Sequence, residues 1–103
     1  MQELTTAERE DAMRALPHWT YDNQRHAIFR TYRFTDFTVA FAFMAQVALA
    51  AEKHNHHPEW SNVYNRVEVY WTTHDVQGLS SNDIALATLC DTYATALLPN
   101  ANA

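Results

Sequence analysis

Residues 52–83, EKHNHHPEWSNVYNRVEVYWTTHDVQGLSSND, decide how this chain folds, and they also hold four of its six histidines. Pro58 disfavours helical dihedrals at His57, because the proline ring crowds the backbone of the residue before it. Asn55 is well suited to the left-handed cap that ends many helices. A helix is therefore expected to end just before the histidine pair, where the backbone becomes extended.

Two runs that favour β-structure follow, at 60–64 and 66–73, on either side of Asn65. In the second run, polar and apolar side chains alternate with the period of a strand. Four residues point to one face, namely Val67, Val69, Trp71 and Thr73, and four to the other, namely Glu68, Tyr70, Thr72 and His74. This pattern predicts two strands, the second of which has one buried face.

Two capping boxes mark the start of the first and last helices. Thr5-x-x-Glu8 opens a short helix, and Ser80-x-x-Asp83 opens a longer one. Prolines at positions 17 and 99 are expected to close these two helices. The chain thus begins and ends its regular structure with a helix.

Between the first helix and the histidines, the sequence predicts a hairpin of strands at 19–22 and 27–34 and then a long helix over 36–54. Thr35 is expected to cap this helix, with Asp36 in its first turn, where a negative charge complements the helix dipole. Apolar residues at three- and four-residue spacings predict the face that packs on the sheet: Phe37, Phe41, Met44, Ala48 and Ala51.

The predicted order is α-β-β-α-β-β-α. It defines an α+β domain in which a four-stranded antiparallel sheet has helices packed on one face, with residues 1–103 forming a single domain. Such a sheet has two edge strands. Pairing an edge with that of a second copy is a common way to cover it, so a homodimer is expected.

Composition limits the classes of function. The net charge is −5 and no cluster of lysine and arginine forms a basic face, which argues against direct nucleic-acid contact. The longest apolar run, 39–51, is too short to span a bilayer, so no membrane association is expected. The single cysteine fits a reducing compartment, and the polar, acidic start is unlike a signal peptide. The expected location is cytoplasmic, or also nuclear in a eukaryotic host.

The histidines are the candidate chemical groups. His56 and His57 follow a helix end and His74 follows a strand end, and these two ends can converge. Histidine gives and takes protons near neutral pH, so two imidazoles across a pocket can act as acid and base on one substrate. Glu52, four residues before His56, is expected to orient that imidazole if the helix persists. Aromatic residues are expected to supply a flat wall for a planar heterocycle, namely Trp60, Tyr64 and Trp71.

The spacing of these residues resembles the pattern of the pterin-4a-carbinolamine dehydratase family, also known as dimerisation cofactors of a homeodomain transcription factor. The pattern is met in order by Glu52, His56-His57-Pro58, Tyr64, His74 and Asp83. Flanking segments agree along nearly the whole chain, among them Phe34-Thr35-Asp36-Phe37, His57-Pro58-Glu59-Trp60, Asn62-Val63-Tyr64-Asn65 and Gly78-Leu79-Ser80.

The resemblance implies the dehydration of 4a-hydroxytetrahydropterin to quinonoid dihydropterin and water, a step in tetrahydrobiopterin recycling. It implies that His56 and His74 are the main acid and base and that His57 chiefly binds and orients the ring. The other residues expected to bind substrate or lie beside the site are Glu52, Pro58, Thr73, Asp75 and Asp83. The implied reaction needs neither a redox cofactor nor a metal.

Other interpretations remain open at this stage. His18, His26 and His54 are expected to be ordinary surface residues, and Asp83 is expected to cap a helix rather than carry a proton. A zinc site would need three or four converging ligands, whereas the side chains of adjacent histidines usually diverge. Metal binding by the histidines is therefore the weaker chemical hypothesis.

The resemblance also implies partners. Besides the pterin substrate and a homodimer, with a tetramer as a further option, these are an aromatic amino acid hydroxylase and a transcription factor. In the alternative function, the protein is an interaction module that stabilises a transcription-factor dimer. The surface expected for this role is on the last helix, at Leu86, Leu89, Tyr93 and Leu97.

Overall fold

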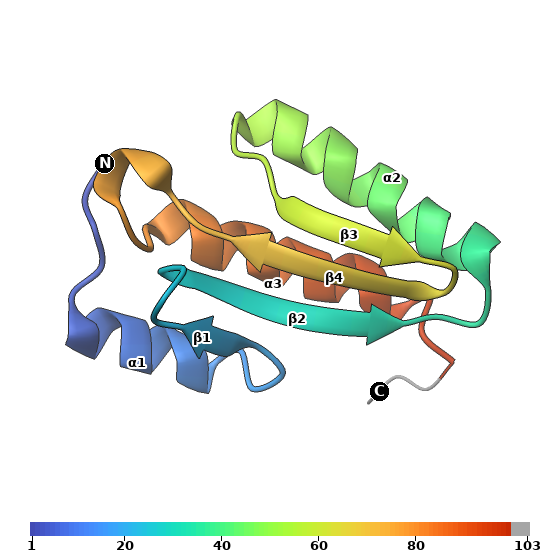
Figure 1. Cartoon of the computed structure of the whole chain (residues 1–103), viewed down its shortest axis with the longest axis horizontal. Helices are drawn as coiled ribbons and strands as arrows, with labels where there is room; N and C mark the ends of the chain where they lie inside the picture. Colours follow the sequence, from blue (N-terminus) through green and yellow to red (C-terminus); the bar gives the residue numbers. More distant parts are fainter. Residues whose placement is uncertain (100–103) are drawn as a thin grey trace.

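The computed structural model describes residues 1–99, and these form three α-helices and a four-stranded antiparallel sheet (Figure 1). A short 3-10 turn, η1, precedes the last helix. In chain order the elements are α1 Thr6–Arg14, β1 Thr20–Asp22, β2 Ala27–Arg33, α2 Phe37–His54, β3 Glu59–Val63, β4 Arg66–Trp71, η1 His74–Val76 and α3 Ser81–Thr95. The predicted α+β class and the order α-β-β-α-β-β-α are confirmed.

The strands lie in the order β1-β2-β4-β3, so β4 is central and β1 and β3 are the edges. Helices α2 and α3 cover one face of the sheet, while α1 lies beside β1 (Figure 1). The predicted alternation in β4 is confirmed, since Val67, Val69 and Trp71 are fully buried under these two helices. β2 turns Ile28 and Tyr32 to the same core.

The predicted buried face of α2 is largely wrong. The helix packs on the sheet through five residues, namely Ala40, Phe43, Val47, Ala50 and Ala51. Phe37 and Phe41 are 49% and 58% exposed, Ala48 is also exposed, and only Ala51 of the predicted stripe is fully buried. Because this helix is apolar on nearly every side, its hydrophobic spacing could not show which side faces the sheet.

The helix ends follow the predicted capping chemistry with one exception. The side chain of Thr5 accepts a hydrogen bond from the Glu8 amide, and Ser80 and Asp83 form the second capping box. Asp36, not Thr35, caps α2, because its carboxylate accepts the amide of Val39 at 2.9 Å. The correction moves the helix start by one residue.

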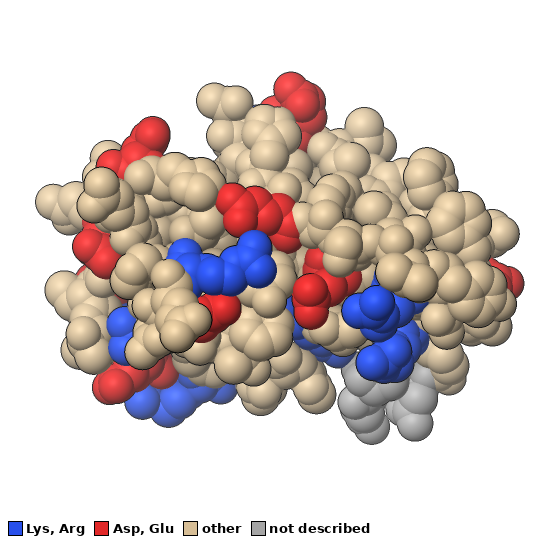
Figure 2. All heavy atoms as spheres, viewed as in Figure 1, with Lys and Arg blue, Asp and Glu red and all other residues tan. Residues whose placement is uncertain are grey.

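The N-terminal segment lies next to the loop between β4 and α3 (Figure 1), where the Leu4 amide donates to the Leu79 carbonyl at 2.8 Å. On the face of the molecule seen in Figure 2, acidic and basic side chains lie interspersed and no broad basic area forms. Within residues 1–99, no helix has the length and apolar character needed to cross a membrane.

Candidate active site

The site forms where the end of α2 meets the end of β4. Asn55 takes the expected left-handed conformation, with φ of 51°, and turns the chain so that residues 56–58 leave the helix. On the other side, a bridge between Thr73 and Gly78 closes the loop that carries η1. The two segments enclose a cleft of about 260 Å³, lined by Asn55, His56, His57, Thr72, Thr73, His74 and Asp75. The predicted convergence of the three histidines is therefore seen in the structure.

His56 belongs to the protected side of the cleft. Its Nε2 lies 2.6 Å from Asp83 Oδ1, and the Asp83 side chain is fully buried. The imidazole also stacks on Trp71, with ring centroids 5.7 Å apart and planes 14° from parallel. The ring is thus fixed from two directions, by a carboxylate at one nitrogen and by an indole beneath its face.

Asp83 is held by the capping box and by one further donor besides His56. Its Oδ2 accepts a hydrogen bond from the Ser80 amide at 2.9 Å, which is part of the capping box, and another from the Thr73 hydroxyl at 2.7 Å. Since the one hydroxyl proton of Thr73 goes to Asp83, Ser80 must donate to the Thr73 oxygen, 2.7 Å away. A carboxylate oxygen can only accept a hydrogen bond here, so we assign a proton to Nε2 of His56. Nδ1 is then the nitrogen left for a ligand.

The other two cleft histidines pair with carboxylates nearer the solvent. His57 Nε2 lies 3.2 Å from Glu52, and His74 Nε2 lies 2.7 Å from Glu59. Glu52 was expected to orient His56, and this prediction is wrong, because Glu52 pairs with His57 instead. The helix ends at His54, and the left-handed Asn55 redirects the chain. The adjacent histidines diverge to different carboxylates, as expected.

The remaining predicted residues occupy different positions. Thr73 and Asp75 line the cleft, whereas Pro58 lies in the connection to β3 outside its lining, and Asp83 lies behind His56. The prediction that Tyr64 forms part of the aromatic wall is wrong. Tyr64 lies in the β3–β4 turn, and the strand β3 separates it from Glu59 by about 16 Å. Trp71 does lie at the site, beneath His56.

Sequence reasoning missed two kinds of site residue. Asn55 and Thr72 line the cleft, and their positions next to His56 and Thr73 were the only signal. Glu59 was quoted only as part of a motif, and its pairing with His74 joins residues 15 positions apart. No local spacing predicts such a contact, because it depends on how β3 lies against β4.

A buried polar cluster lies further along the core. The Asp91 carboxylate of α3 accepts hydrogen bonds from the Arg30 guanidinium at 2.8 Å, from the Tyr32 hydroxyl and from the Trp19 indole. Burial raises the pKa of Tyr32 far above its usual value, helped by the nearby Cys90 thiol and the hydrogen bond to Asp91. Burial also raises the pKa of Cys90 to about 12, while its neighbour Trp71 opposes this shift. We therefore regard Cys90 as part of the core and not as a nucleophile.

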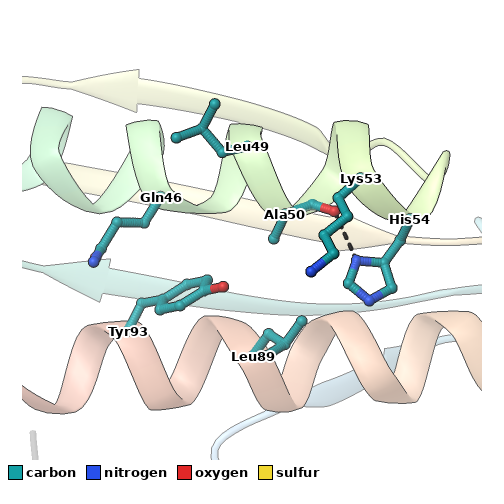
Figure 3. A pocket seen from close by; sticks show the side chains of 7 residues that line it. All are labelled: Gln46, Leu49, Ala50, Lys53, His54, Leu89 and Tyr93. Atoms are coloured by element: carbon teal, nitrogen blue, oxygen red, sulfur yellow. Dashed lines mark hydrogen bonds between the residues drawn. The ribbon is translucent and has the colours of Figure 1, made fainter.

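Among residues 1–99, no group of three or more histidine, cysteine, aspartate or glutamate side chains is arranged to hold a metal ion. A larger hollow of about 470 Å³ lies elsewhere, between α2 and α3 (Figure 3). It is mostly apolar, and His54 closes one end, with its Nδ1 bonded to the Ala50 carbonyl at 2.8 Å. His54 is an exposed last-turn residue, as expected.

The fold and the site together define an α+β protein with a small, histidine-lined cleft at one end of its sheet. The family model described as pterin 4 alpha carbinolamine dehydratase matches residues 2–93. The chain belongs to this family.

Relatives support the assignment over almost the full length. A protein of Rhizorhabdus wittichii named "Putative pterin-4-alpha-carbinolamine dehydratase" is 56% identical over 94 residues, covering 91% of this chain and 97% of that protein. A relative from Burkholderia cenocepacia with the same name is 50% identical over 101 residues, covering 98% and 99%. The crystal structure of a transcriptional coactivator/pterin dehydratase from Brucella melitensis matches with a TM-score of 0.87 at 48% identity, covering 89% of this chain and 98% of that one.

Proposed function

We propose that the protein dehydrates 4a-hydroxytetrahydropterin to quinonoid dihydropterin and water, and that it does so by histidine acid/base catalysis. The observation that carries the proposal is the arrangement of three imidazoles around one cleft, each with its own carboxylate. Membership of the dehydratase family supports the choice of substrate. The biological setting would be the recycling of tetrahydrobiopterin after an aromatic amino acid hydroxylase has acted.

The reaction requires only proton transfers at two places on one ring. The C4a–oxygen bond breaks as a proton reaches the hydroxyl, electrons from the ring nitrogen form the new double bond, and a proton leaves the ring. Two imidazoles in one cleft can perform both transfers, and each typically contributes about 10²–10⁴-fold in rate. Electrons are neither gained nor lost overall, so the chemistry balances without an oxidant or reductant.

The roles follow from which imidazole nitrogens already have a carboxylate partner. His56 uses Nε2 for Asp83 and His74 uses Nε2 for Glu59, which leaves Nδ1 of each for the substrate. The histidine that acts as the acid would carry a proton on Nδ1 and give it to the leaving hydroxyl, and the histidine that acts as the base would take the ring proton on an unprotonated Nδ1. His57, whose Glu52 partner is exposed, would bind and orient the ring, with Thr73 and Asp75 as neighbouring walls of the cleft. Pro58 would set the direction in which the chain leaves the site. Asp83 would act through His56, because its buried carboxylate has no open surface for substrate.

The test is the rate of quinonoid dihydropterin formation from 4a-hydroxytetrahydropterin generated in situ, followed by ultraviolet absorbance. The chelator-treated protein is compared with His56→Ala, His74→Ala and a His18→Ala control, which changes an exposed histidine outside the cleft. We expect clear acceleration by the parent and the control, and large losses in both cleft variants. A parent no faster than the spontaneous reaction would refute the proposal.

A second candidate function, assembly with another chain, is favoured by the exposed face of α2. Phe37, Phe41 and Leu49 are 49%, 58% and 74% exposed, although a helix that is apolar all round is normally buried. The surface expected on α3 is wrong in part, because Leu86 is buried and Leu89, Tyr93 and Leu97 pack partly against the core. The interaction surface is therefore reassigned from α3 to α2.

We propose that a second copy of this chain packs against the exposed face of α2. The charged side chains of α2 are confined to its last turn, at Glu52 and Lys53, so the rest of its exposed surface can pack against an identical apolar surface. The name of the Brucella melitensis protein also raises the alternative that a transcription factor binds here. A homodimer through an edge strand is a separate prediction, and together the two contacts would give a tetramer.

Sedimentation equilibrium of the parent, Leu49→Glu and the matched polar-surface control Thr92→Glu tests this assignment. We expect Leu49→Glu alone to lower the mass of the assembly while leaving circular dichroism unchanged. If the parent and Leu49→Glu have the same mass, a second copy does not cover α2, and the surface becomes available for a different partner.

A further inference from the structure

Glu59 is a carboxylate at the edge of the site that bridges two segments of the chain. It is the first residue of β3, directly after the His-His-Pro motif. Its Oε2 lies 2.7 Å from His74 Nε2, and its Oε1 lies 3.5 Å from Arg25. The carboxylate therefore joins the loop after β4 to the turn between β1 and β2.

The register of the sheet places Glu59 at this point. Glu59 pairs with Tyr70 of β4, which puts both side chains on the sheet face away from α2 and α3. The Tyr70 ring stacks on Phe29, and the Arg25 guanidinium lies over it at 3.7 Å. Arg25 is thus held by an aromatic surface on one side and by Glu59 on the other, which restricts where the carboxylate can move.

The turn that carries Arg25 is itself fixed. Asp22 accepts the backbone amides of Gln24 and Arg25 at 3.0 and 3.1 Å, an arrangement that orders a tight turn. The hydroxyl of Thr72, a residue that lines the cleft, donates to the His26 carbonyl at 2.7 Å. A chain of contacts therefore runs from the β1–β2 turn through Arg25 and Glu59 to His74.

We infer that Glu59 is a positioning residue for His74, and that Arg25 holds the Glu59 carboxylate in place for this role. The inference rests on the proposed dehydratase function. Glu59 accepts a hydrogen bond from the protonated Nε2 of the His74 imidazole. This bond fixes which nitrogen faces Glu59 and how the ring is oriented, and it leaves Nδ1 to exchange a proton with the substrate. In this role Glu59 itself does not contact the substrate.

The exposure of these groups argues that the bridge serves orientation and not stability. The side chains of His74, Glu59 and Arg25 are 80%, 43% and 48% exposed. Ion pairs this open to water contribute little to folding, because solvent screens the charges and the long side chains lose entropy. An exposed imidazole without a hydrogen-bond partner would sample several rotamers, and it would then be aligned with the substrate for only part of the time.

The experiment compares the parent with Glu59→Ala, Glu59→Gln and the control Glu68→Ala. Glu68 also lies on the open sheet face, and its carboxylate is bonded to Thr31 at 3.4 Å, so the control removes a similar charge without touching His74. We expect Glu59→Ala to lower kcat on the order of tenfold with KM nearly unchanged. Glu59→Gln should recover most of this loss, because the amide oxygen still accepts from Nε2. Glu68→Ala should match the parent.

Two further measurements separate positioning from direct catalysis. In a His74→Ala background, adding Glu59→Ala should cause no further loss, whereas a fully additive loss would overturn the inference. Nitrogen-15 spectra of the His74 ring should show the Nε2–H tautomer in the parent and a mixture in Glu59→Ala. An active parent with an equally active Glu59→Ala variant refutes this inference alone, while an inactive parent refutes the proposed function.

Discussion

The inner and outer sides of the cleft use the same pair of chemical groups in opposite surroundings. On the inner side, the side chain of His56 is 11% exposed and bonds to the fully buried Asp83, with Trp71 beneath it and Cys90 in the same core. On the outer side, the 80% exposed His74 bonds to Glu59, which in turn reaches Arg25. Packing fixes the inner pair, whereas only its own short chain of contacts fixes the outer pair. Loss of a carboxylate should therefore affect both folding and activity on the inner side, but activity alone on the outer side.

The largest expected effect concerns Cys90, whose thiol lies in the core behind the inner side of the cleft and should react far more slowly in folded than in denatured protein. Burial raises the pKa of the Cys90 thiol to about 12, so native protein at pH 8 should react with a thiol-alkylating reagent at least about 10³-fold more slowly than protein in denaturant. Mass spectrometry after timed quenching measures the rate. Rapid labelling of folded protein would show that the inner side opens easily and that the comparison is wrong.

The same raised pKa sets the direction of a pH dependence. The folded state keeps the Cys90 proton more firmly than the unfolded chain, whose thiol has a pKa near 9. This contribution to stability is complete below about pH 9 and is lost as the pH rises towards about 12. Tyr32, whose pKa is raised chiefly by burial, acts in the same direction. A Cys90→Ala variant should have a weaker fall in unfolding free energy over this range, as measured by urea titrations at pH 8 and 10.5.

The next largest effect is the loss of unfolding free energy when Asp83 is replaced. Asp83→Ala removes a helix cap and leaves the Ser80 amide and the Thr73 hydroxyl buried without an acceptor, so we expect a loss of about 3 kcal/mol in unfolding free energy. Urea denaturation measures the loss. Asp75→Ala, at an exposed carboxylate of the same cleft, is the stability control and should stay within about 0.5 kcal/mol of the parent. Equal effects in the two variants would remove the proposed distinction between inner and outer sides.

A smaller effect on stability should separate His56 from His74, the two histidines that we propose as acid and base. His56→Ala removes a ring that stacks on Trp71, and we expect it to cost about 1–2 kcal/mol. His74→Ala, on an exposed ring, should change the unfolding free energy by less than about 0.5 kcal/mol while still abolishing most activity. Thermal and urea unfolding of the two variants, beside their rates, provide the measurement. If His74→Ala were the more destabilising change, the outer pair would have a structural role.

The smallest predicted change is in the Arg25–Glu59 pair. Arg25→Ala should lower the unfolding free energy by less than about 0.5 kcal/mol, because both side chains are open to water. It should nevertheless lower kcat, since the carboxylate that orients His74 loses one of its two restraints. Urea unfolding and kinetics of this variant, with Arg14→Ala as a control at an exposed helix pair, test the prediction. A loss of stability without a loss of kcat would reverse our interpretation.

Much of the fold could be predicted because its signals are local. The capping boxes at Thr5 and Ser80, the left-handed Asn55 and the alternation in β4 act over three to six residues, and each is found as expected. The stripe on α2 failed for a physical reason. Phe37 and Phe43 are equally apolar, so only the sheet beneath the helix decides that Phe43 is buried and Phe37 is half exposed.

For the site, the sequence by itself determined that His56 and His57 follow a helix end and that His74 follows a strand end, because these ends reflect local backbone preferences. The tertiary structure decided which carboxylate each histidine receives. Asp83 reaches His56 across 27 residues, and Glu59 reaches His74 across 15. These pairings depend on how α3 docks and how β3 lies against β4, and such long-range contacts are set by packing of the whole core and not by the spacing of residues along the chain.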